Sequence, residues 1–96
     1  MLLLKKIKWN HDKNERLKKE RGISFELIET LIEEGREVDI IANVNYTHQK
    51  IFIFEIDDYI VSAPFVETES EIFLKTLFKS RKLNKQYRGN QHAKKN

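Results

Sequence analysis

The hydrophobic and polar positions of the chain follow two different periods. Phe25, Ile28 and Ile32 recur at three- and four-residue spacing, which is typical of a helix with one buried face. Alternation with a period of two is found before this segment, in Leu2–Trp9, and again after it. The sequence therefore predicts one early strand and a series of later strands over Val38–Val44, Lys50–Ile56, Tyr59–Val66 and Ile72–Phe78.

Capping residues and glycines predict where the helices begin and end. Asn10 and Ser24 are preferred N-cap residues, and Gly22 and Gly35 are natural stops at the C-terminal ends of the two helices that these caps begin. The first of these helices has a single strongly apolar residue, so we expect neighbouring elements to hold it in place. A further helix is predicted over residues 80–87, with the serine of this segment as its N-cap.

Two details of the later strands add to this picture. Asp57-Asp58 lies between two alternating runs and predicts a tight hairpin turn. Pro64 has no N–H, so we expect its strand at an edge of the sheet or bulged at that residue. The predicted order is β-α-α-β-β-β-β-α. It indicates an α+β fold in which a helical hairpin packs on an antiparallel meander sheet.

The composition is that of one soluble globular domain with segregated charge. Of the 96 residues, 40% are hydrophobic and 34% are charged, and we expect a domain over residues 1–89 with a flexible basic tail over 90–96. Residues 1–22 carry eight Lys and Arg against three Asp and Glu, residues 23–71 two against twelve, and residues 72–96 eight against none. If the fold brings the two ends together, one face is cationic and suits a polyanion. Neutralisation of the ends by the acidic middle is the alternative.

Several classes of site and location are disfavoured by the sequence. The glycines are isolated and form no phosphate-binding loop, and the chain has no cysteine. His11, His48 and His92 show no metal-ligand spacing, so we expect neither a metal nor a cofactor. The apolar runs are too short to span a membrane, and the first residues do not resemble a secretion signal. The expected location is the cytoplasm.

The most unusual stretch is KSRKLNKQYRG, residues 79–89, which carries five cations in eleven residues. Arg81 offers a bidentate fork for a phosphate and Lys82 a compact charge. Tyr87 can stack on a base or donate its hydroxyl. Cleavage of RNA without a metal also needs a base, and a surface lysine or tyrosine is a poor base near neutral pH. This stretch therefore predicts phosphate contacts and leaves the base unassigned.

Short pieces of sequence that are spread over residues 7–88 occur in a characteristic order: Trp9-Asn10, Lys13, Gly22, Ser24-Phe25-Glu26 and Ser80-Arg81-Lys82. This ordered set resembles the BrnT-type toxins of bacterial type II toxin–antitoxin systems. Arg21 stands where that family usually has a histidine. With Arg21 at this position, the chain lacks the histidine that would be the best candidate for the general base.

The resemblance implies a compact RelE-like ribonuclease fold and metal-independent endoribonuclease activity that cleaves RNA and arrests growth. It also implies neutralisation by a cognate antitoxin that carries a ribbon-helix-helix or other DNA-binding domain. Contact with operator DNA is then indirect, through the antitoxin, and the two proteins are expected to form a heterotetramer. No membrane partner is expected.

Together, the residues and the resemblance define a hypothesis about the site. We expect the catalytic residues to be Arg81, Lys82 and Tyr87. The RNA-binding residues are expected to be Lys13, Lys19, Arg21, Lys79, Lys85 and Arg88. Two alternatives stay open: a nucleic-acid-binding module without catalysis, and a basic docking domain for an acidic partner protein.

Overall fold

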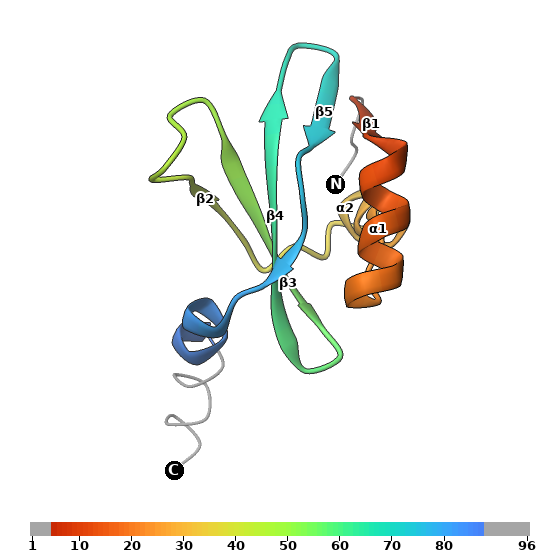
Figure 1. Ribbon diagram of the computed structural model, residues 1–96. Coiled ribbons are helices and arrows are strands. Elements are labelled where there is room, and N and C mark those ends of the chain that lie inside the picture. Colours follow the sequence, from red (N-terminus) through yellow and green to blue (C-terminus); the bar gives the residue numbers. More distant parts are fainter. Residues whose placement is uncertain (1–4, 88–96) are drawn as a thin grey trace.

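The computed structural model describes residues 5–87, and it shows an α+β fold (Figure 1). The predicted α+β class is confirmed, while residues 2–4 of the first expected strand and the expected tail over 90–96 lie outside the described residues. Residues 81–87 form a helix, and the elements before it are β1 (Lys6–Trp9), α1 (His11–Arg21), α2 (Phe25–Glu33), β2 (Asp39–Ala42), β3 (Lys50–Ile56), β4 (Tyr59–Glu67), β5 (Glu71–Leu74) and β6 (Phe78–Lys79).

The strands form one mixed sheet in the order β1-β5-β4-β3-β2, with β6 also paired to β4. The stretch from β2 to β5 is the antiparallel meander that the alternation predicts. The purely antiparallel sheet, however, is wrong, because β1 pairs with β5 in parallel. Ile7 lies opposite Ile72 in this pair, and the pairing brings Ile7 and Trp9 against the hydrophobic core.

The expected single strand over Ile72–Phe78 is divided into β5 and β6. Between them, the Lys75 N–H donates to the Pro64 carbonyl at 2.8 Å. The nitrogen of Pro64 lies on the same side of β4 as its carbonyl, and it has no proton to donate to the ladder. The expectation that this strand lies at an edge of the sheet is wrong, because β4 is central. The pairing of β4 with its neighbour is, however, interrupted at Pro64.

The main core lies between the helical hairpin and one face of the sheet. Trp9 stacks on Phe25 with a ring-centroid distance of 5.7 Å. The side-chain oxygen of Asn14, itself buried in α1, accepts a 2.8 Å hydrogen bond from the Phe25 N–H and fixes the start of α2. The remaining core residues come from both layers: Leu17, Ile23, Ile28, Ile32, Phe52, Phe54, Val61, Ala63, Phe65, Ile72, Leu74 and Leu77.

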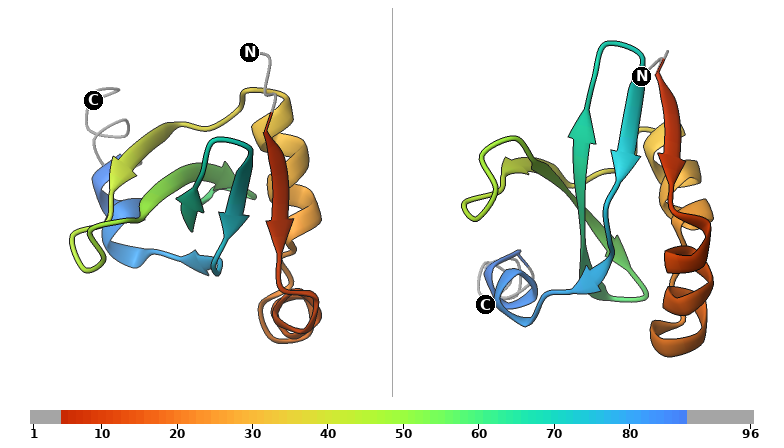
Figure 2. Two further views of the ribbon diagram at one scale, coloured as in Figure 1. Left: turned by 90° about the horizontal axis from the view of Figure 1, so that it is seen from above. Right: turned by 45° about the horizontal axis from the view of Figure 1, so that its top comes forward.

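The other face of the sheet carries the helix over 81–87. Ser80 donates its N–H to the Ile60 carbonyl, and the Ile60 N–H donates to the Asn84 side chain, each at 3.1 Å. The two views of Figure 2 place α1 and α2 on one side of the twisted sheet and this helix on the other. Ile53 and Ile60 are fully buried outside the main core. The helix over 81–87 is thus a packed part of the fold.

The predicted local signals are confirmed. The side chains of Asn10 and Ser24 accept hydrogen bonds from Lys13 and Leu27, and that of Ser80 accepts one from Leu83. Gly22 and Gly35 both have a φ of 66°, in the left-handed region that favours glycine after a helix. Asp57 and Asp58 have φ values of 51° and 62°, as the predicted tight hairpin requires. Among residues 5–87, no helix is long and apolar enough to cross a membrane.

Candidate functional site

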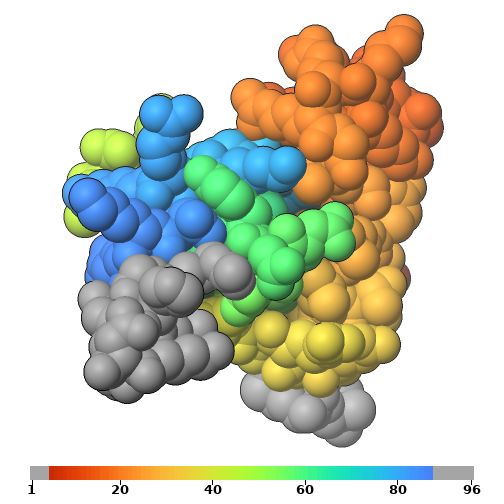
Figure 3. All heavy atoms as spheres, turned by 90° about the horizontal axis from the view of Figure 1, so that it is seen from below, coloured from red at the N-terminus to blue at the C-terminus, as the bar shows by residue number. Residues whose placement is uncertain are grey.

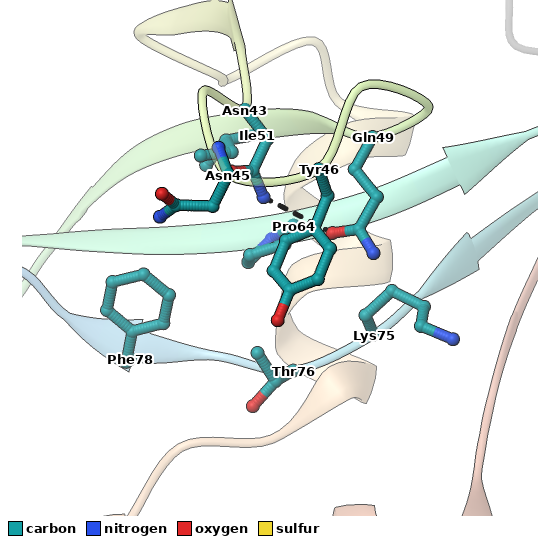
Figure 4. Close-up of a pocket in the computed structure, with 9 residues that line it drawn as sticks. All are labelled: Asn43, Asn45, Tyr46, Gln49, Ile51, Pro64, Lys75, Thr76 and Phe78. Atoms are coloured by element: carbon teal, nitrogen blue, oxygen red, sulfur yellow. Dashed lines mark hydrogen bonds between the residues drawn. The ribbon is translucent and has the colours of Figure 1, made fainter.

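A cleft of about 540 Å³ opens on the sheet face that carries the helix over 81–87 (Figure 4). One wall is the loop between β2 and β3, and the other is the segment between β5 and β6. A cleft of this size lies within the range of small-molecule sites. None of the described residues that line it is a carboxylate: they are Asn43, Asn45, Tyr46, Gln49, Ile51, Pro64, Lys75, Thr76 and Phe78.

The loop wall is held by its own hydrogen bonds. The Tyr46 N–H donates to the Asn43 carbonyl at 3.3 Å, and the Gln49 N–H donates to the Tyr46 carbonyl at 3.0 Å. Asn43 also links its side-chain amide to the Gln49 side chain at 3.2 Å and accepts from the Asn45 N–H at 3.0 Å. The ring of Tyr46 is therefore presented on a braced loop, although the residue is 61% exposed.

The opposite wall is the interruption that Pro64 causes in the ladder. Lys75, Thr76 and Phe78 line the cleft from this segment. The Lys75 ammonium lies over the ring of Phe73, 5.3 Å from its centroid. In Figure 4 the Tyr46 hydroxyl is directed toward Thr76, and the rings of Tyr46 and Phe78 stand clear of each other. The cleft thus has two aromatic side chains, one cation and several amides.

The basic residues of the last helix follow the cleft residue Phe78 closely along the chain. Arg81, Lys82 and Lys85 are exposed on the helix over 81–87. Arg81 follows Phe78 by three residues, so the two Cα atoms lie within about 11 Å of each other. Arg88 lies outside the described residues. Arg81 and Lys82 therefore belong to a docked helix that begins three residues after a residue that lines the cleft.

Tyr87, which the sequence predicts to stack on a base or to donate its hydroxyl, uses this hydroxyl in a hydrogen bond within the fold. Its hydroxyl donates a 2.8 Å hydrogen bond to an Asp39 carboxylate oxygen in β2. Burial, followed by the hydrogen bond and the negative charge of Asp39, raises the pKa of Tyr87. A hydroxyl that is both engaged and less acidic is a poor proton donor to a leaving group. The geometry favours a positioning role, in which Tyr87 fastens the helix to the sheet.

Arg21 and Lys79 are brought together at the end of α1. They line a surface hollow with Glu20 and Phe78, and Figure 3 shows the C-terminal end of α1 and the helix over 81–87 on the same end of the molecule. Arg21 donates a 2.5 Å hydrogen bond to the Leu77 carbonyl. Arg21 is therefore bonded to the backbone between β5 and β6.

Lys13 and Lys19 lie apart from the cleft. Both are in α1, which covers the opposite face of the sheet (Figure 2). Lys19 borders a shallow hollow with Arg16, and the neighbouring Lys18 is paired with Glu15 at 3.1 Å. The two basic segments of the chain therefore meet at Arg21 and Lys79. The rest of α1, with Lys13 and Lys19, lies on the other side of the sheet from the last helix.

The cleft residues Tyr46, Lys75 and Phe78 were missed by sequence reasoning. Only one signal could have indicated the loop wall: a single aromatic residue within the polar run 45–49. Lys75 and Phe78 fall in a run that predicts a regular strand, and a regular strand gives no reason to expect a cleft. Within residues 5–87, no group of three or more His, Asp or Glu side chains is placed to hold a metal ion.

Comparison with protein-family models, with curated proteins and with solved structures finds no match to this chain. The sequence pattern and the geometry of the cleft are therefore the features that indicate a function.

Proposed function

We propose that this chain acts on single-stranded RNA as a metal-independent endoribonuclease of the toxin type. The observation that carries the proposal is the cleft between the β2–β3 loop and the β5–β6 segment. Among the described residues, its lining has two exposed aromatic residues, Tyr46 and Phe78, one cation and no carboxylate. Phe78 is followed three residues later by the start of a helix with three exposed cations. A site for a polyanion with aromatic bases has this composition.

The proposed toxin class rests on the ordered sequence pieces from Trp9 to Lys82. A helical hairpin on one face of a largely antiparallel sheet, with a basic C-terminal helix on the other, supports a RelE-like fold. In this proposal the chain works in the cytoplasm, where its RNA is found. A cognate DNA-binding antitoxin neutralises it by covering the basic helix with acidic residues.

The proposed chemistry centres on the helix over 81–87. Arg81 stabilises negative charge on the phosphate in the transition state, and Lys82 holds the neighbouring backbone. Tyr87 acts through the helix, by keeping these cations in place. Arg21 supports the segment between β5 and β6 through its bond to the Leu77 carbonyl.

A second candidate function is RNA binding without cleavage. Two observations favour it: Arg21 replaces the family histidine and is bonded to Leu77, and the Tyr87 hydroxyl is bonded to Asp39. Neither group is free to move a proton at the phosphate. The two candidates share the binding surface and differ only in whether the RNA is cut.

Expression without a partner tests the toxin proposal. We expect growth to stop, and Arg81→Ala to restore it at an equal protein level. Arg16→Ala is the matched control, because Arg16 is an exposed arginine on α1, away from the cleft. Growth that is indifferent to the wild-type protein would contradict the toxin proposal. Growth arrest that Arg81→Ala and Arg16→Ala relieve equally would contradict the assigned site.

A further inference from the structure

We propose that the cleft binds a single unstacked nucleobase of the RNA, with Tyr46 and Phe78 as its aromatic walls. This inference rests on the proposed function, since it takes single-stranded RNA as the ligand. It goes further by separating two tasks. The helix over 81–87 contacts phosphates, while the cleft selects an unpaired base and reads its edge.

The exposure of the two rings is the first support. Tyr46 is 61% exposed and Phe78 37% exposed, and both line the same cleft from segments far apart in the chain. The loop that carries Tyr46 is braced by backbone hydrogen bonds between Asn43, Tyr46 and Gln49. An aromatic ring held on a braced loop, without being buried, is a ready stacking surface for a base.

The amides of the loop are the second support. Gln49 uses its side-chain oxygen to accept from Asn43, so its own NH₂ group is left to donate. The Asn45 carboxamide has no hydrogen bond to another described side chain, and it also lines the cleft. Carboxamides present a donor and an acceptor side by side, as recognition of a base edge requires.

The electrostatics of the cleft are the third support. Lys75 is exposed at the wall, and within residues 5–87 no carboxylate lines the cleft to repel a phosphate. The chain then leads through Phe78 to Arg81 at the start of the basic helix. When one base of an RNA strand binds in the cleft, the phosphates next to that base can therefore contact Lys75 and Arg81.

This geometry predicts selectivity for single strands. A base within a duplex is stacked and paired, and it must leave the stack before it can meet Tyr46. The ligand is thus a base in a loop, a bulge or an end. Because Asn45 and Gln49 face the cleft, they are the residues that determine which base is preferred.

The test measures binding of a short labelled single-stranded RNA to the whole chain by fluorescence anisotropy. Tyr46→Ala and Phe78→Leu should each weaken binding about tenfold, the effect of one lost base–aromatic contact. Tyr46→Phe should bind as the wild type does. Val44→Ala is the matched control, because Val44 is 93% exposed on the same loop and does not line the cleft.

Further binding experiments distinguish recognition of the base from recognition of the phosphates. An abasic oligonucleotide of equal length keeps every phosphate, and it should bind the wild type only as well as RNA binds Tyr46→Ala. A photoreactive iodouridine in the strand should form its adduct with Tyr46 or Phe78. Asn45→Ala should change the ranking of homopolymers while retaining much of the affinity.

The outcomes distinguish this inference from the proposed function. If wild-type protein binds no single-stranded RNA, the proposed function fails and the inference fails with it. If RNA binds with salt dependence but equally well to Tyr46→Ala and Phe78→Leu, the inference alone is overturned. Equal binding of the abasic strand or of duplex RNA would also overturn it. Thermal unfolding of each variant establishes that it is folded.

Discussion

The hydroxyl of Tyr87 donates a 2.8 Å hydrogen bond to Asp39, and this bond joins the last helix to the edge strand β2. Together with the Ser80 and Asn84 contacts to Ile60, it fixes both ends of the helix over 81–87 to the sheet. Arg81 and Lys82 are thus mounted on a docked element. Their placement, and with it the site, depends on this docking.

Tyr87→Phe keeps the ring and removes the bond to Asp39. We expect it to lower the free energy of unfolding by about 1 kcal/mol, the usual net contribution of one hydrogen bond. Asp39→Ala should have a similar effect, and the double variant should lose less than the sum of the two, because both changes remove the same bond. Urea unfolding measures all four proteins. Additive effects would show that the bond does not couple the helix to β2.

The raised pKa of Tyr87 predicts a dependence on alkaline pH. The folded state keeps the proton more tightly than the unfolded state, in which the pKa is near 10.0. The extra stability is fully present below pH 10.0 and is lost as the pH rises through the higher pKa of the folded state. The difference in unfolding free energy between wild type and Tyr87→Phe should therefore shrink above this pH. A difference that grows there would contradict the assigned direction.

Asn14→Ala removes the acceptor for the buried Phe25 N–H. We expect it to lower the free energy of unfolding by about 1–3 kcal/mol, because that donor is left without a partner. Glu26→Ala is the control: it removes the second hydrogen bond of Asn14, together with an exposed ion pair to Lys18, and leaves the acceptor for the Phe25 N–H in place. In chemical denaturation, the free energy of unfolding of Asn14→Ala should be well below that of Glu26→Ala. Equal losses would show that the Phe25 contact is not the important one.

Arg81→Ala and Lys82→Ala should change the salt dependence of RNA binding. Each lost phosphate contact should reduce the slope of log K against log salt by about 0.7 for a single strand. Lys19→Ala should leave the slope unchanged, because Lys19 lies on α1, across the sheet from the cleft. A titration series at several salt concentrations gives the slopes. A reduced slope for Lys19→Ala would show that α1 also contacts the RNA.

The parts of the fold that depend on neighbours in sequence could be predicted. The caps at Asn10, Ser24 and Ser80 act within three residues, and the Asp57-Asp58 turn requires only that both residues adopt a positive φ. The parallel pairing of β1 with β5 could not be predicted, because alternation shows which face of a strand is buried and not which strand lies beside it.

The candidate site depends even more on contacts between segments that are far apart in the sequence. The break between β5 and β6 depends on Pro64 in another strand, so the Ile72–Phe78 run gives no sign of it. Tyr46 and Phe78 share a cleft only because the loop and this break lie on the same sheet face. Charge counting found the basic helix, but it could not show that α1 lies on the other side of the sheet.

The most direct test of RNA cleavage uses purified, partner-free protein and total RNA in the presence of a metal chelator. Mapping of the RNA ends should reveal discrete cuts in unpaired segments, and Arg81→Ala should abolish them while Arg16→Ala does not. RNA ends that are identical with and without the wild-type protein would contradict the endoribonuclease assignment.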